Sequence, residues 1–383
     1  MACLENTDRK SPRVDFPIFA VLARTLRTTA PAGKWENQPR MIFAGIDESG
    51  YGPLLGPLCV GCAVFALPAG TSPDAAPPCL WRALSSAVCR ATNDRRRRIA
   101  VEDSKKLKGA KDAAAHPLRH LERGVMAFAS AVPRAPAEWN DDHALLAALG
   151  ALPAPPAAGT MAAPPAPWHA AAHPLPVGND APGLRIAGAM LRAALAKAGI
   201  EATALAVRAI DAHEFNDQAR RIANKATINF MAAARHVDRV RRLAAARGMH
   251  AWIALDRQGG RTEYRAPLQS SFPDARIRIL EESDAAQRYR LDFPASDGLP
   301  AHAATLSFEM GGEERHLPIA LASMAAKFAR ELHMRRLNAY FARHVADLKP
   351  TAGYVLDGRR FLEDVASAME RMGIDRESIV RAV

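Results

Sequence analysis

The stretch MIFAGIDESGYGPLLGPLCVGCAVFAL, residues 41–67, decides the fold of this 383-residue chain. The apolar run 41–46 predicts a buried strand that stops at the two acids Asp47 and Glu48. Glycines and prolines then break any regular element. The next apolar run, 58–67, predicts a second strand, antiparallel to the first. Two carboxylates therefore lie where a core strand enters a glycine-rich turn.

Asp47 and Glu48 allow two interpretations. Removing two carboxylates from water at the end of a core strand is costly unless a cation compensates their charge. Magnesium or manganese would do so, because hard cations prefer carboxylate oxygens. The backbone amides of the glycine-rich turn would also let a phosphate approach closely. The alternative is that the two acids cap a turn and face water, as most acidic pairs do.

Further acids follow a similar pattern. The apolar run 249–255 predicts another buried strand, which ends at Asp256 and is followed by a glycine pair. Glu313 and Glu314 follow two glycines and precede Pro318, a residue suited to the first turn of a helix. Carboxylates gathered at strand ends and a helix start fit a two-metal site. In such a site one ion activates water and the other stabilises the leaving oxygen of a phosphodiester.

The composition is that of a large globular protein with a basic balance. Hydrophobic residues make up 49% of the chain, and 51 Lys and Arg against 40 Asp and Glu give a net charge of +11. That charge favours a polyanionic partner. No apolar run reaches the length of a membrane span. Five cysteines without a disulfide-framework spacing indicate a reducing compartment. We therefore expect a cytoplasmic protein without membrane contact.

Cys59 and Cys62 have the spacing of a C-x-x-C pair. They lie inside the predicted strand 58–67, where residues three apart face opposite sides of a sheet. No second pair follows at zinc spacing, so both are predicted to be core residues.

The remaining pattern alternates between helices and strands, with two stretches that lack core periodicity. Residues 1–40 are basic and contain prolines, and residues 132–186 are dominated by alanine and proline. We expect both stretches to be dispensable for catalysis, the second over about 134–184. Helices are expected at 80–88, 184–198, 216–246, 319–344 and 360–372, and further strands at 203–207, 249–255, 276–282 and 304–310.

Several motifs together resemble the ribonuclease HII family. Residues 45–57, GIDESGYGPLLGP, match its opening pattern G-[IV]-D-E-[AV]-G-R-G-P-L-x-G-P, and DSKKL at 103–107 matches a second family segment. ASMAAK at 322–327, with Arg330 and Glu331 after it, resembles the family helix A-S-I-x-A-K-x-x-R-D. The strand ending at Asp256 falls where the family has its third acid. A late Gly-Tyr turn ends at Tyr354.

The resemblance implies an α/β, RNase H-like fold, in which a mixed five-stranded sheet is flanked by helices. It also implies a long C-terminal helical part and an Ala/Pro-rich insertion. The chain would then divide into a disordered extension (1–40), the two parts of an RNase H-like domain (41–131 and 187–347), the insertion or linker between them (132–186), and a C-terminal helical tail (348–383).

The resemblance also implies site residues. Asp47, Glu48 and Asp256 would be catalytic acids that hold two Mg²⁺ or Mn²⁺ ions. The fourth acid, an Asp in the family, is here a Glu: counting back from Pro318 points to Glu314, and counting back from Ser323 points to Glu313. The residues implied to bind substrate are Gly50, Tyr51, Gly52, Lys105, Ser323, Lys327 and Tyr354.

The main departure from the family pattern is at position 51, where the G-R-G sequence becomes Gly50-Tyr51-Gly52. The family uses this region to sense the ribose 2′-hydroxyl. The stretch after Asp256 also differs from the family's D-G-[NR]-x. Both departures indicate a divergent branch. Tyr51 would stack on a sugar or base, or else pack against the turn at Tyr354.

The leading hypothesis is a metal-dependent hydrolase, an endoribonuclease that cleaves RNA in RNA–DNA hybrids. An RNase H-like nuclease acting on DNA or on particular nucleic-acid structures is the alternative within the enzymes. A third hypothesis is a nucleic-acid-binding protein that kept the fold without turnover. The acids at every expected position argue against the last.

Overall fold

The computed structural model describes residues 41–68, 76–109, 115–136, 138–153, 165–222, 224–258 and 261–382, so the predicted extension 1–40 lies outside the described residues. The strands are β1 (Met41–Ser49), β2 (Leu58–Ala66), β3 (Val88–Cys89), β4 (Ile99–Ala100), β5 (Glu201–Ile210), β6 (His250–Asp256), β7 (Arg276–Glu282), β8 (Ala286–Phe293) and β9 (His302–Glu309). The helices are α2 (Leu80–Ala83), α3 (Ser104–Leu107), α4 (Arg119–Ala131), α5 (Asp142–Leu149), α6 (Ala181–Ala198), α7 (Ala212–Ile222), α8 (Lys225–Ala246), α9 (Arg265–Ser271), α10 (Gly312–Arg315), α11 (Leu317–Phe341) and α12 (Val355–Met372), with short 3₁₀ turns η1 (Pro167–His169) and η2 (Arg376–Ser378).

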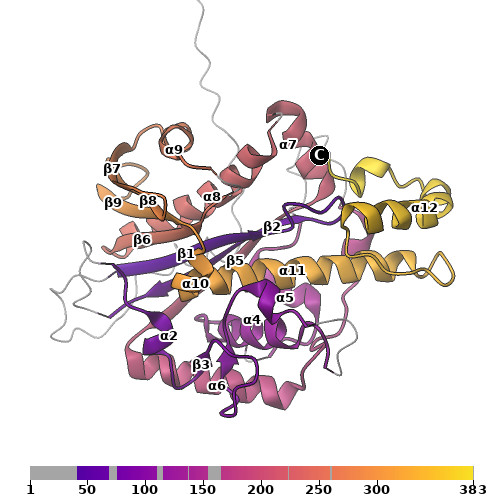
Figure 1. The fold of residues 1–383 in the computed structure, drawn as a ribbon, viewed down its shortest axis with the longest axis horizontal. Helices are drawn as coiled ribbons and strands as arrows, with labels where there is room; N and C mark the ends of the chain where they lie inside the picture. The colour runs from indigo at the N-terminus through magenta and orange to yellow at the C-terminus, as the bar shows by residue number, and fades with distance from the viewer. Residues whose placement is uncertain are drawn as a thin grey trace, which may run out of the picture.

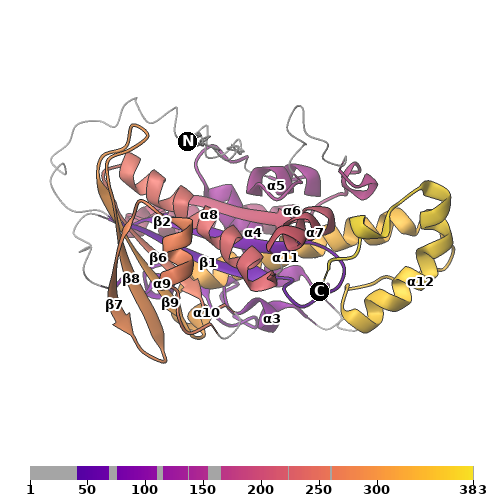
Figure 2. The same ribbon diagram turned by 90° about the horizontal axis from the view of Figure 1, so that it is seen from above.

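A single large mixed sheet forms the middle layer, with strand order β5-β2-β1-β6-β9-β8-β7. β1, β6 and β9 are parallel neighbours, whereas β2 is antiparallel to both β1 and β5. Helices α7 and α8 lie on one side of the sheet, and α4, α6 and α11 lie on the other (Figures 1 and 2). The predicted α/β architecture, a mixed sheet flanked by helices, is confirmed. The expected number of five strands is wrong, because the antiparallel strands β8 and β7 extend the sheet beyond β9 to seven.

The middle of the sheet is buried on both faces, which explains why β1 and β2 are continuous apolar runs. Alternate residues of these strands join two different cores: Phe43 and Cys59 pack with α4, α6 and α11, whereas Ile42 and Cys62 pack with α8. Cys59 and Cys62 are both fully buried, and burial raises the pKa of each thiol to about 12. The prediction that both are core residues, facing opposite sides, is confirmed.

Two glycines let α11 lie directly on the sheet. A Cβ atom at Gly45 would stand 2.1 Å from the backbone of Pro318 and Ile319, and one at Gly61 would stand 2.1 Å from the carbonyl oxygen of Ala322. No side chain fits in either position. The first turns of α11 are therefore held against the end of β1, directly beside Asp47.

The alanine- and proline-rich range 132–186 buries more than its composition predicts. Within its described parts, Leu145, Leu146 and Leu149 of α5 are buried in the core that contains α11. Trp168 of η1 packs against the other end of α11, in a cluster with Phe341. These described parts therefore belong to the core although the range lacks core periodicity in the sequence, and its assignment as an insertion or linker stays a prediction.

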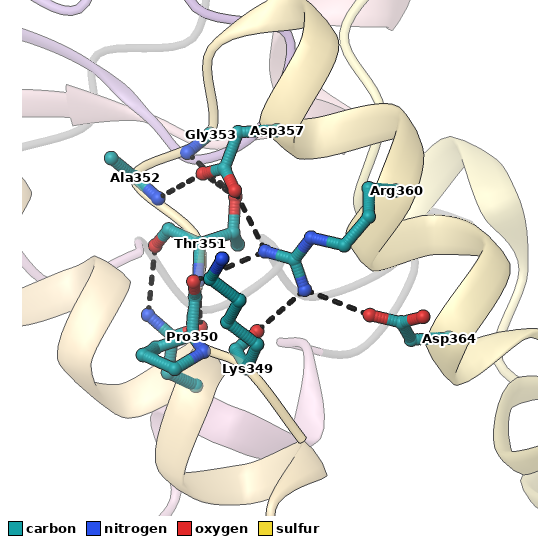
Figure 3. A network of polar contacts seen from close by, with 9 residues as sticks. Lys349, Pro350, Thr351, Ala352, Gly353, Asp357, Arg360 and Asp364 are labelled. Carbon is teal, nitrogen blue, oxygen red and sulfur yellow. Dashed lines mark hydrogen bonds and ion pairs between the residues drawn. The ribbon is translucent and has the colours of Figure 1, made fainter. Parts of the chain in front are cut away.

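A polar network fixes the turn that precedes α12 (Figure 3). The carboxylate of Asp357 accepts hydrogen bonds from the Thr351 hydroxyl at 2.7 Å and from the Ala352 amide at 2.8 Å. Arg360 bonds the other oxygen of Asp357 at 2.7 Å and donates to the carbonyl of Lys349 at 2.7 Å. The turn is thereby held in one conformation, and its Gly353 carbonyl accepts the amides of Leu54 and Leu55, at 2.8 and 3.0 Å.

Two predicted helices differ from the structure, and one strand was missed. The helix expected at 80–88 ends after one turn, at α2, and Val88 begins β3 instead. The helix expected at 216–246 is two helices, because Asn224 adopts an extended backbone and caps α8 through its side chain. Strand β8 was not predicted; its alternating pattern of buried and half-buried residues carries three charges. No helix among the described residues has the length and apolar character needed to cross a membrane.

Candidate nuclease site

Three parallel strands bring their carboxyl ends to one edge of the sheet. The register places Ile46 beside Leu255 and Asp256 beside Glu309. Asp47 and Glu48 therefore lie next to Asp256 although more than two hundred residues separate them. The short helix α10, which follows β9, adds Glu313 to the same edge.

Asp47 lies at the centre of this edge. Its side chain accepts a 2.8 Å hydrogen bond from the backbone amide of Glu48 and is also hydrogen-bonded by Ser323 of α11. Burial raises the pKa of Asp47 well above its usual value, and the charges of Glu48 and Asp256 raise it further. The two hydrogen bonds oppose this shift without cancelling it. Asp47 thus has acidic neighbours, and within the described residues it forms no ion pair with a basic side chain.

The pKa values of Glu48 and Asp256 are raised as well. Burial raises the pKa of Glu48, with the charge of Glu313 adding to the effect, while Asn229 and Lys105 oppose it. Burial and the charge of Glu313 raise the pKa of Asp256 to about 7, although the Gly312 amide donates a 2.8 Å hydrogen bond to it.

The structure separates the two candidates for the fourth acid. Glu313 hydrogen-bonds Asp256, and its buried Oε2 atom has no hydrogen-bond partner. Glu314 is exposed and forms an ion pair with Lys106, at 2.9 Å. Only Glu313 lies with Asp47, Glu48 and Asp256. We name these four residues the carboxylate cluster.

A fifth acid at the same edge shows the opposite environment. Glu309 is buried, but it accepts hydrogen bonds from Ser307 at 2.9 Å and from His316 at 3.1 Å. Although burial opposes its ionisation, these contacts and Arg315 hold the pKa of Glu309 at about 2. Glu309 is therefore a satisfied structural carboxylate.

The predicted basic residues lie beside the carboxylate cluster. Lys105 is exposed at the start of α3, near enough to Glu48 to favour its ionised form. Ser323 lies 3.1 Å from Ser104, which joins α3 to α11 at this point. Lys327, one turn further along α11, is half-buried, and its ammonium lies 3.9 Å from Glu331. Burial, together with the neighbouring charges of Lys108, Arg330 and Lys105, lowers the pKa of Lys327.

The glycine-rich loop lies next to these groups. Gly50 has a left-handed backbone conformation (φ +90°) and is packed against Arg330, whereas Gly52 is exposed with nothing within 4 Å of a Cβ position. Tyr51 packs against the core beneath α8, and the ammonium of Lys225 lies 4.6 Å from the centre of its ring. One alternative in the sequence analysis was that Tyr51 packs against the turn at Tyr354, and the observed packing differs from it. Tyr354 itself is exposed at the start of α12.

The sequence analysis assigned no role to two residues near the site. Asn229 is almost fully buried on α8 and hydrogen-bonds Glu48. A buried asparagine on the apolar stripe of a helix was the available signal. Lys225, above Tyr51, directly follows the cap of α8, and only the structure places it over the loop.

The carboxylate cluster suits a hard divalent cation by the chemistry of its donors. All four residues are half-buried, so solvent reaches them. Glu313 Oε2 is a buried oxygen without a partner. As the side chains stand, no group of three or more His, Cys, Asp or Glu residues in the described ranges is arranged to hold a metal ion. Burial and the charges of neighbouring acids raise the pKa values of Asp47, Glu48 and Asp256.

No family model matches the chain, and no curated protein matches it. Solved structures do. The chain is similar to the RNase HII of Archaeoglobus fulgidus, solved in complex with PCNA, with 14% identity, coverage of 89% of this chain and 93% of that chain, and a TM-score of 0.37. It is similar to the ribonuclease H2 of Pyrococcus horikoshii OT3, with 12% identity, coverage of 88% and 92%, and a TM-score of 0.41.

A third similar structure is Bst-RNase HIII in complex with Mn²⁺, with 14% identity, coverage of 93% of this chain and 72% of that chain, and a TM-score of 0.36. These proteins include ribonucleases HII and HIII alike, so they do not single out the family that the motifs resemble. At identities of 12–14% and TM-scores below 0.5, these similarities establish neither a family nor an activity for this chain.

Proposed function

We propose that this protein is a divalent-metal-dependent endonuclease that hydrolyses RNA phosphodiester bonds in RNA–DNA hybrids. The observation that carries the proposal is the carboxylate cluster. Asp47, Glu48, Asp256 and Glu313 come from separate parts of the chain, and within the described residues none of them forms an ion pair. A group of acids assembled against its own electrostatic repulsion stabilises the fold poorly and binds cations well.

In this proposal the four acids hold two Mg²⁺ or Mn²⁺ ions. When bound, the ions supply Lewis-acid activation of water and charge stabilisation at the leaving oxygen. The protein's own contribution is to fix the acids on rigid elements: Asp47 and Glu48 on β1, Asp256 on β6, and Glu313 on α10. Ser323 and Asn229 orient Asp47 and Glu48 by hydrogen bonds.

The substrate side of the proposal rests on the groups around the cluster. Lys105 and Lys327 would attract the phosphates as point charges. The exposed Gly52 leaves room for a close approach of a nucleic-acid backbone. Tyr354, exposed at the start of α12, would offer an aromatic face to a sugar or base.

The test is cleavage of end-labelled duplexes of one sequence, prepared as RNA–DNA hybrid, double-stranded DNA and double-stranded RNA. Each is incubated with the purified protein in Mg²⁺, in Mn²⁺ and in chelator. The proposal expects metal-dependent nicking of the RNA strand of the hybrid and no cleavage in chelator. Preferential cleavage of DNA would replace it with the alternative of a DNA or structure-selective nuclease. Binding without cleavage of any duplex would favour a non-catalytic nucleic-acid-binding protein.

A further inference from the structure

The C-terminal segment returns to the glycine-rich loop after α12. Leu55 forms an isolated antiparallel bridge with Val380, and the amide of Arg381 donates to the carbonyl of Leu54 at 3.1 Å. The loop is therefore held on two sides, since Gly353 accepts the amides of Leu54 and Leu55 from the other direction. The network of Figure 3 fixes the turn that carries Gly353.

The side chain of Arg381 reaches beneath the first residues of this loop. It is 2% exposed, and its Nη2 atom donates to the carbonyl oxygens of Gly50, at 2.6 Å, and Pro53. Its Nε and Nη1 atoms are buried without a hydrogen-bond partner, and its guanidinium lies over the ring of Phe215. Within the described residues, no acid forms an ion pair with it.

A second buried guanidinium lies beside the same loop. Arg330 of α11 is also 2% exposed, and it donates to the carbonyls of Leu55 at 3.1 Å and Ala352 at 2.9 Å. Its Nε atom has no partner, and no acid among the described residues pairs with it either. Two buried arginines bonded only to neutral carbonyls leave uncompensated positive charge under the loop. Such charge is costly to the fold when no anion is present.

At the tip of the loop Gly52 is exposed, whereas Gly50 and Tyr51 are half-buried. The carbonyl of Gly50 is engaged by Arg381, whereas in the described chain the amides of Gly50, Tyr51 and Gly52 donate no hydrogen bond. Successive free amides at a glycine-rich turn form an anion-binding site when the backbone is held in place. The loop therefore combines three amides without a hydrogen bond in the described chain with uncompensated charge beneath them.

We propose that Arg381 is a positioning residue for a phosphate-binding loop at Gly50-Tyr51-Gly52. It holds the loop carbonyls inward, so that the loop amides stay available to a backbone phosphate of the bound nucleic acid. Its charge, together with that of Arg330, strengthens the attraction. This inference rests on the proposed function only in taking the anion to be a nucleic-acid phosphate. A purely structural arginine would make the same two carbonyl contacts but would not affect binding.

The experiment compares Arg381→Met and Arg381→Lys with Arg376→Met. The control removes the same charge from an exposed position five residues away in the same segment. Affinity is measured by fluorescence anisotropy in chelator, over a range of salt concentrations, with labelled RNA–DNA hybrid and duplex DNA of about 20 base pairs. Thermal unfolding of each protein is measured in parallel.

The inference predicts that Arg381→Met binds about tenfold more weakly than wild type. The slope of its log affinity against log salt concentration should also become shallower, by about the amount that one phosphate contact contributes. Its melting temperature should equal or exceed that of the wild type, because an unpaired buried charge is removed. Arg381→Lys should bind with intermediate affinity, and Arg376→Met should bind within about twofold of wild type because exposed single charges contribute little.

Two results would overturn the inference. One is equal affinity of Arg381→Met and Arg376→Met. The other is a weakened Arg381→Met that also melts far below wild type and is not improved by lysine, which is the behaviour of a structural residue. If the wild type binds duplex DNA but not the hybrid, the proposed substrate is wrong. The affinities of the Arg381 variants are then compared on duplex DNA. If it binds neither duplex, both proposals fail.

Discussion

Two groups of ionisable side chains lie along α11, and they differ in whether a neighbouring side chain supplies the opposite charge. Near the end of the helix, Arg336 and Asp142 are both fully buried and form a two-pronged ion pair at 2.6 and 3.0 Å. Near its start lies the carboxylate cluster, in which Asp47, Glu48 and Asp256 have raised pKa values and no acid forms an ion pair in the described chain. The first group is satisfied by the protein itself. The second has no such partner within the described residues, and this difference is what separates a structural acid from a candidate functional one.

The largest expected effect is that of Asp47→Asn on cleavage. The amide keeps the size of the side chain but loses the charge that would hold metal, so we expect hybrid cleavage to fall by about a thousandfold, or ~4 kcal/mol of barrier. Removing one of several repelling carboxylates should leave the melting temperature unchanged or higher. Initial rates in Mg²⁺ and a thermal melt measure both. Wild-type turnover by the purified variant would refute the assignment of the site.

The matching change in the satisfied group should affect stability instead. Asp142→Ala leaves Arg336 buried without its partner, which costs about 3–5 kcal/mol of unfolding free energy. Denaturant unfolding at neutral pH measures this loss. The double variant Asp142→Leu with Arg336→Met should recover much of it, because no buried charge remains. A single variant as stable as wild type would show that the pair is not a structural one.

The Asp142 pair also gives a pH dependence. Although burial opposes ionisation, the hydrogen bonds from Arg336 and from the His173 amide lower the pKa of Asp142. Its contribution to stability is therefore present above the unfolded value of about 3.9 and is lost as the pH falls through the lower folded value. The difference in unfolding free energy between wild type and Asp142→Ala should accordingly disappear only in that acidic range.

The same comparison, of an acid in the carboxylate cluster with an acid in an ion pair, can be made between the adjacent residues Glu313 and Glu314. Glu313→Gln should lower hybrid cleavage by about a hundredfold, whereas Glu314→Gln removes only an exposed ion pair with Lys106 and should stay within about threefold of wild type. Initial rates of the two variants, measured side by side, decide between them. A larger loss for Glu314→Gln would reverse the assignment of the fourth acid.

The smallest expected effect is at Tyr51. The wild type should discriminate weakly between a single embedded ribonucleotide and a continuous RNA strand, because tyrosine offers only a hydroxyl and a ring. Tyr51→Arg adds a cation close to Lys225, so it should shift cleavage a few-fold towards the single-ribonucleotide junction and steepen the salt dependence. Product patterns on denaturing gels give the readout. Identical patterns and salt slopes would leave Tyr51 a packing residue.

The sequence was most informative where local pattern and burial agree. The runs that form β1, β2 and β6 are apolar and end in acids, so both the strands and the positions of Asp47 and Asp256 could be predicted. It was least informative where distant segments meet. Nothing local in Asp142 indicates a partner 194 residues away, and α5 is short and rich in alanine. The ambiguity between Glu313 and Glu314 is of the same kind, because only the packing of α10 separates them.

The central claim, that the carboxylate cluster binds a divalent cation, is tested most directly by thermal unfolding with and without Mn²⁺. A ligand that binds only the folded state raises the melting temperature according to its affinity. The account predicts that Mn²⁺ raises the melting temperature of the wild type and of Glu314→Gln equally, and that Asp47→Asn and Glu313→Gln lose most of the increase. An absent increase in the wild type, or an equal increase in all four proteins, would contradict the claim.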